Sequence, residues 1–108
     1  MSSVRQLYPP PNLIAIDVDG TLVDKHGNLN TALVEWIRQR KADGHELALW
    51  SMQGRRHAQT TAEAFGIADL FEMILAKPGM IVDDQGWHWI KYTKVVKSLS
   101  EPVDKPLC

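Results

Sequence analysis

The stretch "IAIDVDGTLVD" (residues 14–24) carries three aspartates at and beyond the end of an apolar run. Extended back to Leu13, the run is continuous and rich in β-branched residues, which is typical of a strand covered on both faces in a parallel sheet. Asp17 and Asp19 lie two residues apart, and Gly20 follows them. Carboxylates this close repel each other and lose hydration energy when buried. A bound cation would offset that loss, so the stretch predicts a polar site at the carboxyl end of a strand.

The pattern beyond this stretch alternates between helix and strand. Periodic apolar positions predict a helix that begins at Asn30 or Thr31 and ends before Gly44, and a second helix over 54–65. Turn-forming residues at 24–30 predict a short hairpin or flap. Such an alternation predicts an α/β fold with a mostly parallel sheet and right-handed crossovers. The predicted strands span 13–18, 46–51, 70–75 and 80–84.

Length and composition narrow the class of protein. A chain of 108 residues supports one domain, expected over 13–100, after an extended proline-containing lead-in (1–12) and before a tail (101–108). The net charge of −1 gives no basic field, so nucleic acid is expected only as a substrate. No run of 18 apolar residues is present, no secretory leader is expected, and the one cysteine is Cys108. These features predict a cytoplasmic protein that does not span a membrane.

Polar residues stand at or just beyond the ends of the four predicted strands. "DVDGT" (17–21) is followed in order by a strand ending in Ser51, by Lys77-Pro78, and by Asp83-Asp84. This order resembles the haloacid dehalogenase-like (HAD) phosphohydrolases over residues 13–90, nearly the whole core. The resemblance implies a three-layer, Rossmann-like sheet with helices on both faces. In such sheets, ligands bind beyond the carboxyl ends of the strands.

The resemblance also implies chemical roles for the acidic residues. Asp17 would be the nucleophile that forms an aspartyl-phosphate, and Asp19 the general acid and base. Mg²⁺ would be held by the Asp17 side chain, the Asp19 backbone carbonyl and one acidic group of the last motif. Asp84 stands where the family's direct ligand usually lies, with Asp83 in the outer shell, although the reverse assignment stays open.

Phosphate-binding residues are implied in the same register. Gly20 would let the backbone turn beside the phosphate, with Thr21 supporting the turn. The Ser51 hydroxyl and the backbone N–H groups that follow, beginning at Met52, would hold phosphate oxygens. Lys77 would neutralise the charge of the nucleophile and the phosphate. A plain helix-entry serine and a solvated surface lysine are the alternatives, and the order of the motifs favours the functional reading.

Several further side chains have two alternative readings each. Arg55 and Arg56 either contact the substrate phosphate or are solvated residues of the first helical turn. Trp87 and Trp89 alternate along the chain and are expected to pack against the sheet edge rather than to stack on a base.

Three of the four histidines have predicted roles. His26 lies in the flap and is less expected to touch the leaving group than to be a surface residue. His45 and His57 are expected to be surface or packing histidines.

Too few residues separate the motifs for a cap domain, so an open, uncapped site is expected. The predicted function is Mg²⁺-dependent hydrolysis of a phosphomonoester, whether a small molecule or the phosphorylated end of a macromolecule. A homo-oligomer in which a second subunit covers the site is possible. The alternatives are a polynucleotide 3′-phosphatase or nucleotidase, and a catalytically idle module that binds phosphate and metal. A phospho-acceptor receiver domain, which also uses aspartates, a hydroxyl and a lysine, has these groups in a different order.

Overall fold

The structure, a computed structural model, describes residues 12–88 and 93–97. Most of the predicted lead-in, the whole predicted tail and Trp89 lie outside the described residues. No helix in the described ranges is long and apolar enough to cross a membrane. The elements are β1 (Leu13–Asp17), α2 (Thr31–Ala42), β2 (Glu46–Ser51), α3 (Arg55–Ala64), the short 3₁₀ helix η1 (Ala68–Leu70) and β3 (Met73–Ala76).

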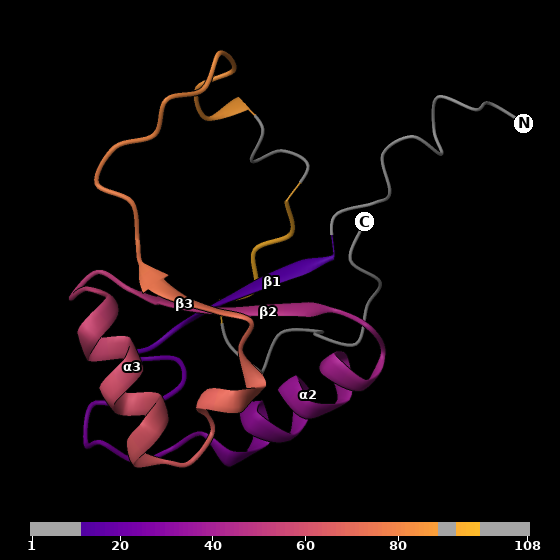
Figure 1. Cartoon of the computed structure of the whole chain (residues 1–108), viewed down its shortest axis with the longest axis vertical. Coiled ribbons are helices and arrows are strands. Elements are labelled where there is room, and N and C mark those ends of the chain that lie inside the picture. Colours follow the sequence, from indigo (N-terminus) through magenta and orange to yellow (C-terminus); the bar gives the residue numbers. More distant parts are fainter. Residues whose placement is uncertain (1–11, 89–92, 98–108) are drawn as a thin grey trace, which may run out of the picture.

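The three strands form a parallel sheet in the order β1-β2-β3, which confirms the predicted α/β fold. The register places Asp17 beside Trp50, and Ser51 beside Ala76. The carboxyl ends of all three strands therefore meet at one edge of the sheet. Helices α2 and α3 lie on the same side of the sheet (Figure 1), and the second helix layer implied by the resemblance does not occur among the residues described.

The core lies between this side of the sheet and the two helices. Leu47 and Leu49 of the central strand are fully buried, as the continuous apolar run predicts. Helix α3 presents Ala58 and Ala62 to the sheet, and their small side chains let the helix approach closely. Helix α2 contributes an apolar stripe at helical spacing, namely Leu33, Val34 and Ile37.

The ends of α2 follow from its flanking residues. The Asn30 side chain accepts a hydrogen bond from the Leu33 N–H at 3.0 Å, so Asn30 is the N-cap. Beyond Asp43, Gly44 has φ +97°, a conformation that residues with a Cβ rarely adopt, and the chain leaves the helix there. Both limits confirm the predicted helix.

The prediction of a strand over 80–84 is wrong. Met80 and Val82 are 81% and 93% exposed, and the chain turns after them, with the Gly86 N–H donating to the Asp83 carbonyl at 3.1 Å. A short apolar run has the sequence pattern of a buried strand. A strand also needs a neighbouring strand that forms hydrogen bonds with its backbone N–H and C=O groups. Among the described residues β1 pairs only with β2, so this segment has no partner.

Two smaller predictions also differ from the structure. The third strand begins at Met73 rather than at residue 70, because Leu70 closes η1 and Phe71 is buried in the core. Phe65, expected to face inward with Ala58 and Ala62, is 38% exposed at the end of α3.

Glu72 ties the sheet to α2 just before β3 begins. Its carboxylate accepts the Leu47 N–H at 2.7 Å and pairs with the Lys41 ammonium at 2.6 Å. The hydrogen bond from the Leu47 N–H lowers the pKa of Glu72 below its ordinary value of 4.5, and the Lys41 ammonium lowers it further by a smaller amount. A lowered pKa in the folded state means that this carboxylate stabilises the fold above about pH 4.5, and that its contribution is lost as the pH falls through the folded-state pKa.

We therefore expect Glu72→Gln to lower the free energy of unfolding at pH 7 and to lose that effect as the pH falls through the folded-state pKa of Glu72. Because Glu72 is 40% exposed, the change at pH 7 should be at most about 1 kcal/mol, or about 4–8 °C in Tm. Thermal melts of wild type and variant between pH 3 and pH 7 measure it. Glu35→Gln, on the exposed face of α2, is the matched control. A Tm difference that stays constant across this pH range would contradict the assignment.

Candidate active site

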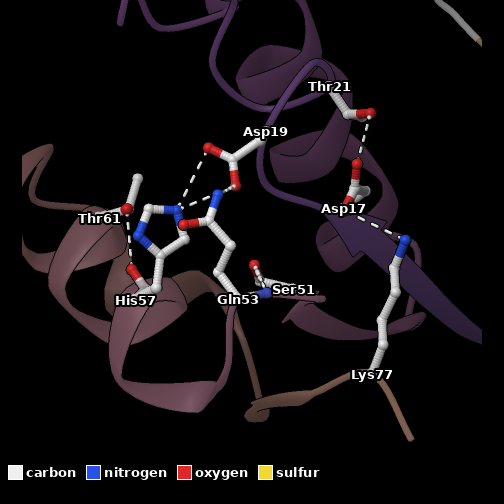
Figure 2. Close-up of polar contacts among 8 residues, drawn as sticks. All are labelled: Asp17, Asp19, Thr21, Ser51, Gln53, His57, Thr61 and Lys77. Carbon is white, nitrogen blue, oxygen red and sulfur yellow. Dashed lines mark hydrogen bonds and ion pairs between the residues drawn. The ribbon is translucent and has the colours of Figure 1, made fainter. Parts of the chain in front are cut away.

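Asp17 ends β1 with its carboxylate held between two side chains (Figure 2). Its Oδ1 pairs with the Lys77 Nζ at 3.2 Å, and its Oδ2 accepts a hydrogen bond from the Thr21 hydroxyl at 3.4 Å. Both carboxylate oxygens thus have polar partners, although the side chain stays 33% exposed and accessible to a ligand. The predicted nucleophile, phosphate lysine and supporting threonine are brought together.

Backbone contacts position Lys77 at this edge. Its N–H donates to the Ser51 carbonyl at 3.0 Å, which extends the pairing of β2 and β3 by one residue. Its ammonium also lies 5.7 Å from the centre of the Trp50 ring, within the range of a cation–π contact. Trp50 is partly buried, and its contact with the Lys77 side chain helps to hold the ammonium beside Asp17.

The turn after β1 is fixed by buried neighbours. Gly20 has φ +83°, and its N–H donates to the Val23 carbonyl at 2.7 Å. A Cβ added at Gly20 would meet no atom within 4 Å, so the backbone conformation, rather than space, requires glycine. The fully buried Val18 and Leu22 hold the two sides of this turn in the core.

Ser51 is the last residue of β2, directly before the loop that leads into α3. It is 1% exposed, and its hydroxyl accepts the Gln53 N–H at 2.9 Å, while its carbonyl accepts the Gly54 N–H at 3.2 Å. These bonds fold the loop back so that α3 starts beside the same sheet edge. The first N–H groups of a helix have no partner within it and attract anions. The Met52 side chain is 79% exposed. Of this residue, only the backbone N–H group is a candidate for phosphate binding.

Asp19 points toward the first turn of α3 rather than toward Lys77 (Figure 2). The His57 Nε2 lies 3.0 Å from its Oδ2 and 3.2 Å from its Oδ1, and the Gln53 side-chain amide donates to Oδ2 at 2.9 Å. His57 is 34% exposed, which agrees with a surface position, but its contact with Asp19 was not predicted. The sequence order places the start of the helix after the Ser51 loop near the sheet edge where Asp19 lies, but it does not show which residue of the first turn faces that carboxylate.

The acidic pair at 83–84 lies apart from these residues. The Asp83 carboxylate accepts the Gln85 N–H at 2.8 Å, and Asp84 accepts from the Gln85 side-chain amide at 3.3 Å. Across the described ranges, no group of three or more acidic, histidine or cysteine side chains is arranged to hold a metal ion. The carboxylates of Asp17 and Asp19 are hard oxygen donors suited to Mg²⁺, but the third predicted acidic ligand is not gathered with them. The fit to the ion is thus partial.

The other candidates lie outside the site. Arg55 and Arg56 are exposed in the first turn of α3, and Trp87 is 65% exposed. The His45 ring lies 3.1 Å from the Asn12 carbonyl, which is a structural contact.

The flap at 24–28 is held by Asp24. The carboxylate of Asp24 accepts the backbone N–H groups of Asn28 at 2.9 Å and His26 at 2.8 Å. These bonds lower the pKa of Asp24, and the bond from the Asn28 N–H has the largest effect. A shallow cleft separates this flap from α3, and its lining includes Asp19, Gly20, Val23, Lys25, His57 and Phe65. The cleft therefore opens directly beside Asp19.

A carboxylate beside an ammonium, a second carboxylate two residues on, and a helix N-terminus all lie at one sheet edge. This arrangement can bind an anion and bring two oxygen nucleophiles or proton carriers close to it. A family model for haloacid dehalogenase-like hydrolases matches residues 14–102. No curated protein and no solved structure matched the chain. Since the matched region covers most of the sequence, the chain belongs to the haloacid dehalogenase-like hydrolases.

Proposed function

We propose that the protein hydrolyses phosphomonoesters through a covalent intermediate on Asp17. The observation that carries this proposal is the 3.2 Å pair between the Asp17 carboxylate and the Lys77 ammonium, at the edge where Ser51 and the start of α3 also lie. A phosphate dianion approaching a carboxylate is repelled, and the Lys77 charge reduces that repulsion. Membership of the hydrolase family supports the same chemistry.

In the first step, an Asp17 oxygen attacks phosphorus while the bond from phosphorus to the ester oxygen breaks. The departing oxygen takes a proton from the carboxyl group of Asp19, which becomes a carboxylate. The Ser51 hydroxyl, the backbone N–H groups after it and Lys77 hold the other phosphate oxygens. The products of this step are the free alcohol and an aspartyl-phosphate.

In the second step, water attacks the phosphorus of the aspartyl-phosphate. The Asp19 carboxylate accepts a proton from this water, so the residue returns to its starting form. The bond between phosphorus and the Asp17 oxygen breaks, which releases inorganic phosphate and frees the carboxylate. One difficult displacement is thereby divided into two easier ones.

Turnover of an aryl phosphate by the purified protein tests this function. A screen over nucleotides, sugar phosphates, phosphopeptides and 3′-phosphorylated oligonucleotides then identifies the substrate class. Preference for the oligonucleotides or nucleotides would favour the polynucleotide 3′-phosphatase or nucleotidase. Phosphate binding without turnover of any ester would favour the idle module and contradict the proposal.

The site is proposed to act without a cap domain. Only residues 18–30 connect β1 to α2, and they form the turn and the flap. The chain between β2 and β3 is largely taken up by α3 and η1. A site this open to solvent suits a large phosphorylated substrate, or a small one that a second subunit covers.

We also propose that the reaction depends on Mg²⁺, held by Asp17, the Asp19 carbonyl and an acidic residue of the 83–84 pair. When bound, the ion would neutralise part of the phosphate charge. Because the acidic pair lies apart from Asp17 in the structure, this part of the proposal requires the loop that carries it to approach the sheet edge.

We expect Asp84→Asn to weaken Mg²⁺ binding more than about 100-fold, and Asp83→Asn about 10–100-fold, because an outer residue only orients a direct ligand. Calorimetric titration of the protein with Mg²⁺ measures both, and an activity assay with and without the ion accompanies it. The reverse ranking would make Asp83 the direct ligand. Unchanged affinity in both variants would remove the acidic pair from the site.

A further inference from the structure

The Asp19 carboxylate is held by two residues that the proposed chemistry does not otherwise use. His57 contacts both of its oxygens, at 3.0 and 3.2 Å, and the Gln53 amide donates to Oδ2 at 2.9 Å. Figure 2 shows both side chains converging on Asp19, Gln53 from the loop before α3 and His57 from the first turn of the helix. We call Gln53 and His57 the Asp19 clamp.

The clamp matters because Asp19 would otherwise be free to rotate. Its side chain is 47% exposed on a turn, and a carboxylate in water has several rotamers of similar energy. Three contacts from two side chains select one of these rotamers. An ionised carboxylate only accepts hydrogen bonds, so the His57 Nε2 carries the hydrogen when it contacts ionised Asp19.

The clamp is itself fixed by the fold. The Gln53 backbone N–H donates to the buried Ser51 hydroxyl at 2.9 Å, and His57 lies one residue before the fully buried Ala58. The Thr61 hydroxyl donates to the His57 carbonyl at 2.8 Å within the helix. Both residues therefore stand on a backbone anchored to the core, from which they can hold the more exposed turn.

The held carboxylate borders the cleft between the flap and α3. With its ester group directed toward this cleft, a phosphate bound at the sheet edge would have its leaving oxygen beside Asp19. Proton transfer in a transition state requires the donor within hydrogen-bond reach in a fixed direction. We propose that Gln53 and His57 are positioning residues that aim the Asp19 carboxyl at the leaving oxygen, an inference that rests on the proposed phosphatase function.

If the clamp has this role, the loss of kcat/KM on removing it should depend on how readily the leaving group departs. An alkoxide leaves poorly and needs protonation, whereas an acidic phenol leaves with little help. His57→Phe keeps a ring of similar shape but removes the N–H, and we expect it to lower kcat/KM for an alkyl phosphate about 10–100-fold. For an aryl phosphate with an acidic phenol, we expect a change of at most about threefold. Gln53→Ala should show the same selectivity with a smaller loss.

The experiment compares kcat/KM on both esters for wild type, His57→Phe, His57→Gln and Gln53→Ala. His57→Gln retains a side-chain N–H donor at a similar reach and should recover much of the alkyl phosphatase activity. Gln59→Ala, on the same helix but bonded to Glu63, is the control. Thermal melts check that each variant is folded.

The possible outcomes separate the clamp from the function. Equal losses on both esters would show a general structural role, and unchanged activity on both would show no role, so either result would overturn the clamp alone. Failure of wild type to hydrolyse any phosphomonoester would overturn the proposed function and the clamp with it. A loss confined to the alkyl ester, restored by His57→Gln, supports both.

Discussion

Replacing Asp17 with asparagine is expected to lower kcat for an aryl phosphate by about four orders of magnitude or more. An amide oxygen is a far weaker nucleophile toward phosphorus than a carboxylate, so the covalent intermediate cannot form at a useful rate. The replacement has nearly the same shape, and its oxygen can still accept the Thr21 hydroxyl. The ion pair with Lys77 is lost, but for a side chain 33% exposed this costs at most about 1 kcal/mol of stability.

Steady-state kinetics measures the loss, and acid quenching of the reaction with a ³²P-labelled substrate detects the intermediate. Wild type should carry an acid-stable label that is absent from Asp17→Asn. Asp69→Asn, exposed in η1 away from the strand ends, is the matched control and should keep full activity. If wild type and Asp17→Asn turn over equally, Asp17 is not the nucleophile.

Much of the fold was predictable because its elements are encoded locally. The apolar run that ends at Asp17 and the run that ends at Ser51 became β1 and β2, and the spacing of Ala58 and Ala62 gave the buried face of α3. Asn30 and Gly44 marked the limits of α2 through side-chain capping and positive φ. In each case the signal lies within a few residues of the element itself.

The part of the site that lies at the ends of the strands was also predictable. Parallel strands meet at their carboxyl ends, so Asp17, Ser51 and Lys77 were predicted to lie together, and the structure brings them together. The segment at 80–84 shows the limit of this reasoning. Its apolar pattern describes what burial would require, but pairing depends on a neighbouring strand that no local signal provides.

His57 was missed for a related reason. A histidine on the first turn of a helix faces solvent, the sheet or a loop according to how the helix sits on the sheet, and this depends on packing by Ala58 and Ala62. Its partner Asp19 is distant in the sequence. The interaction follows from tertiary placement, which a single sequence does not contain.

The two carboxylates of the site have different contact partners. Lys77 accompanies Asp17, while Gln53 and His57 accompany Asp19, so the two neighbouring carboxylates have separate partners and point apart (Figure 2). This separation reduces the repulsion that the sequence made evident. It also leaves one carboxylate next to a cation that can bind phosphate and the other next to the cleft.

Lys77→Met is accordingly expected to reduce kcat/KM by about 10²–10³-fold. Methionine keeps the length and apolar contact of the side chain over Trp50, and the backbone N–H of residue 77 still donates to the Ser51 carbonyl, so the loop should stay in place. What is lost is the charge that offsets the repulsion between the Asp17 carboxylate and the phosphate. Lys77→Arg retains that charge and should recover part of the activity.

Two measurements on Lys77→Met distinguish phosphate binding from a general disturbance of the site. Competitive inhibition by inorganic phosphate should weaken together with kcat/KM, since both depend on the same charge. Arg38→Met removes a cation from the exposed face of α2 and should change neither quantity. If Lys77→Met keeps both its phosphate affinity and its kcat/KM, the ammonium 3.2 Å from Asp17 does not act on the substrate, and the phosphate must be bound by the Ser51 loop and the start of α3 alone.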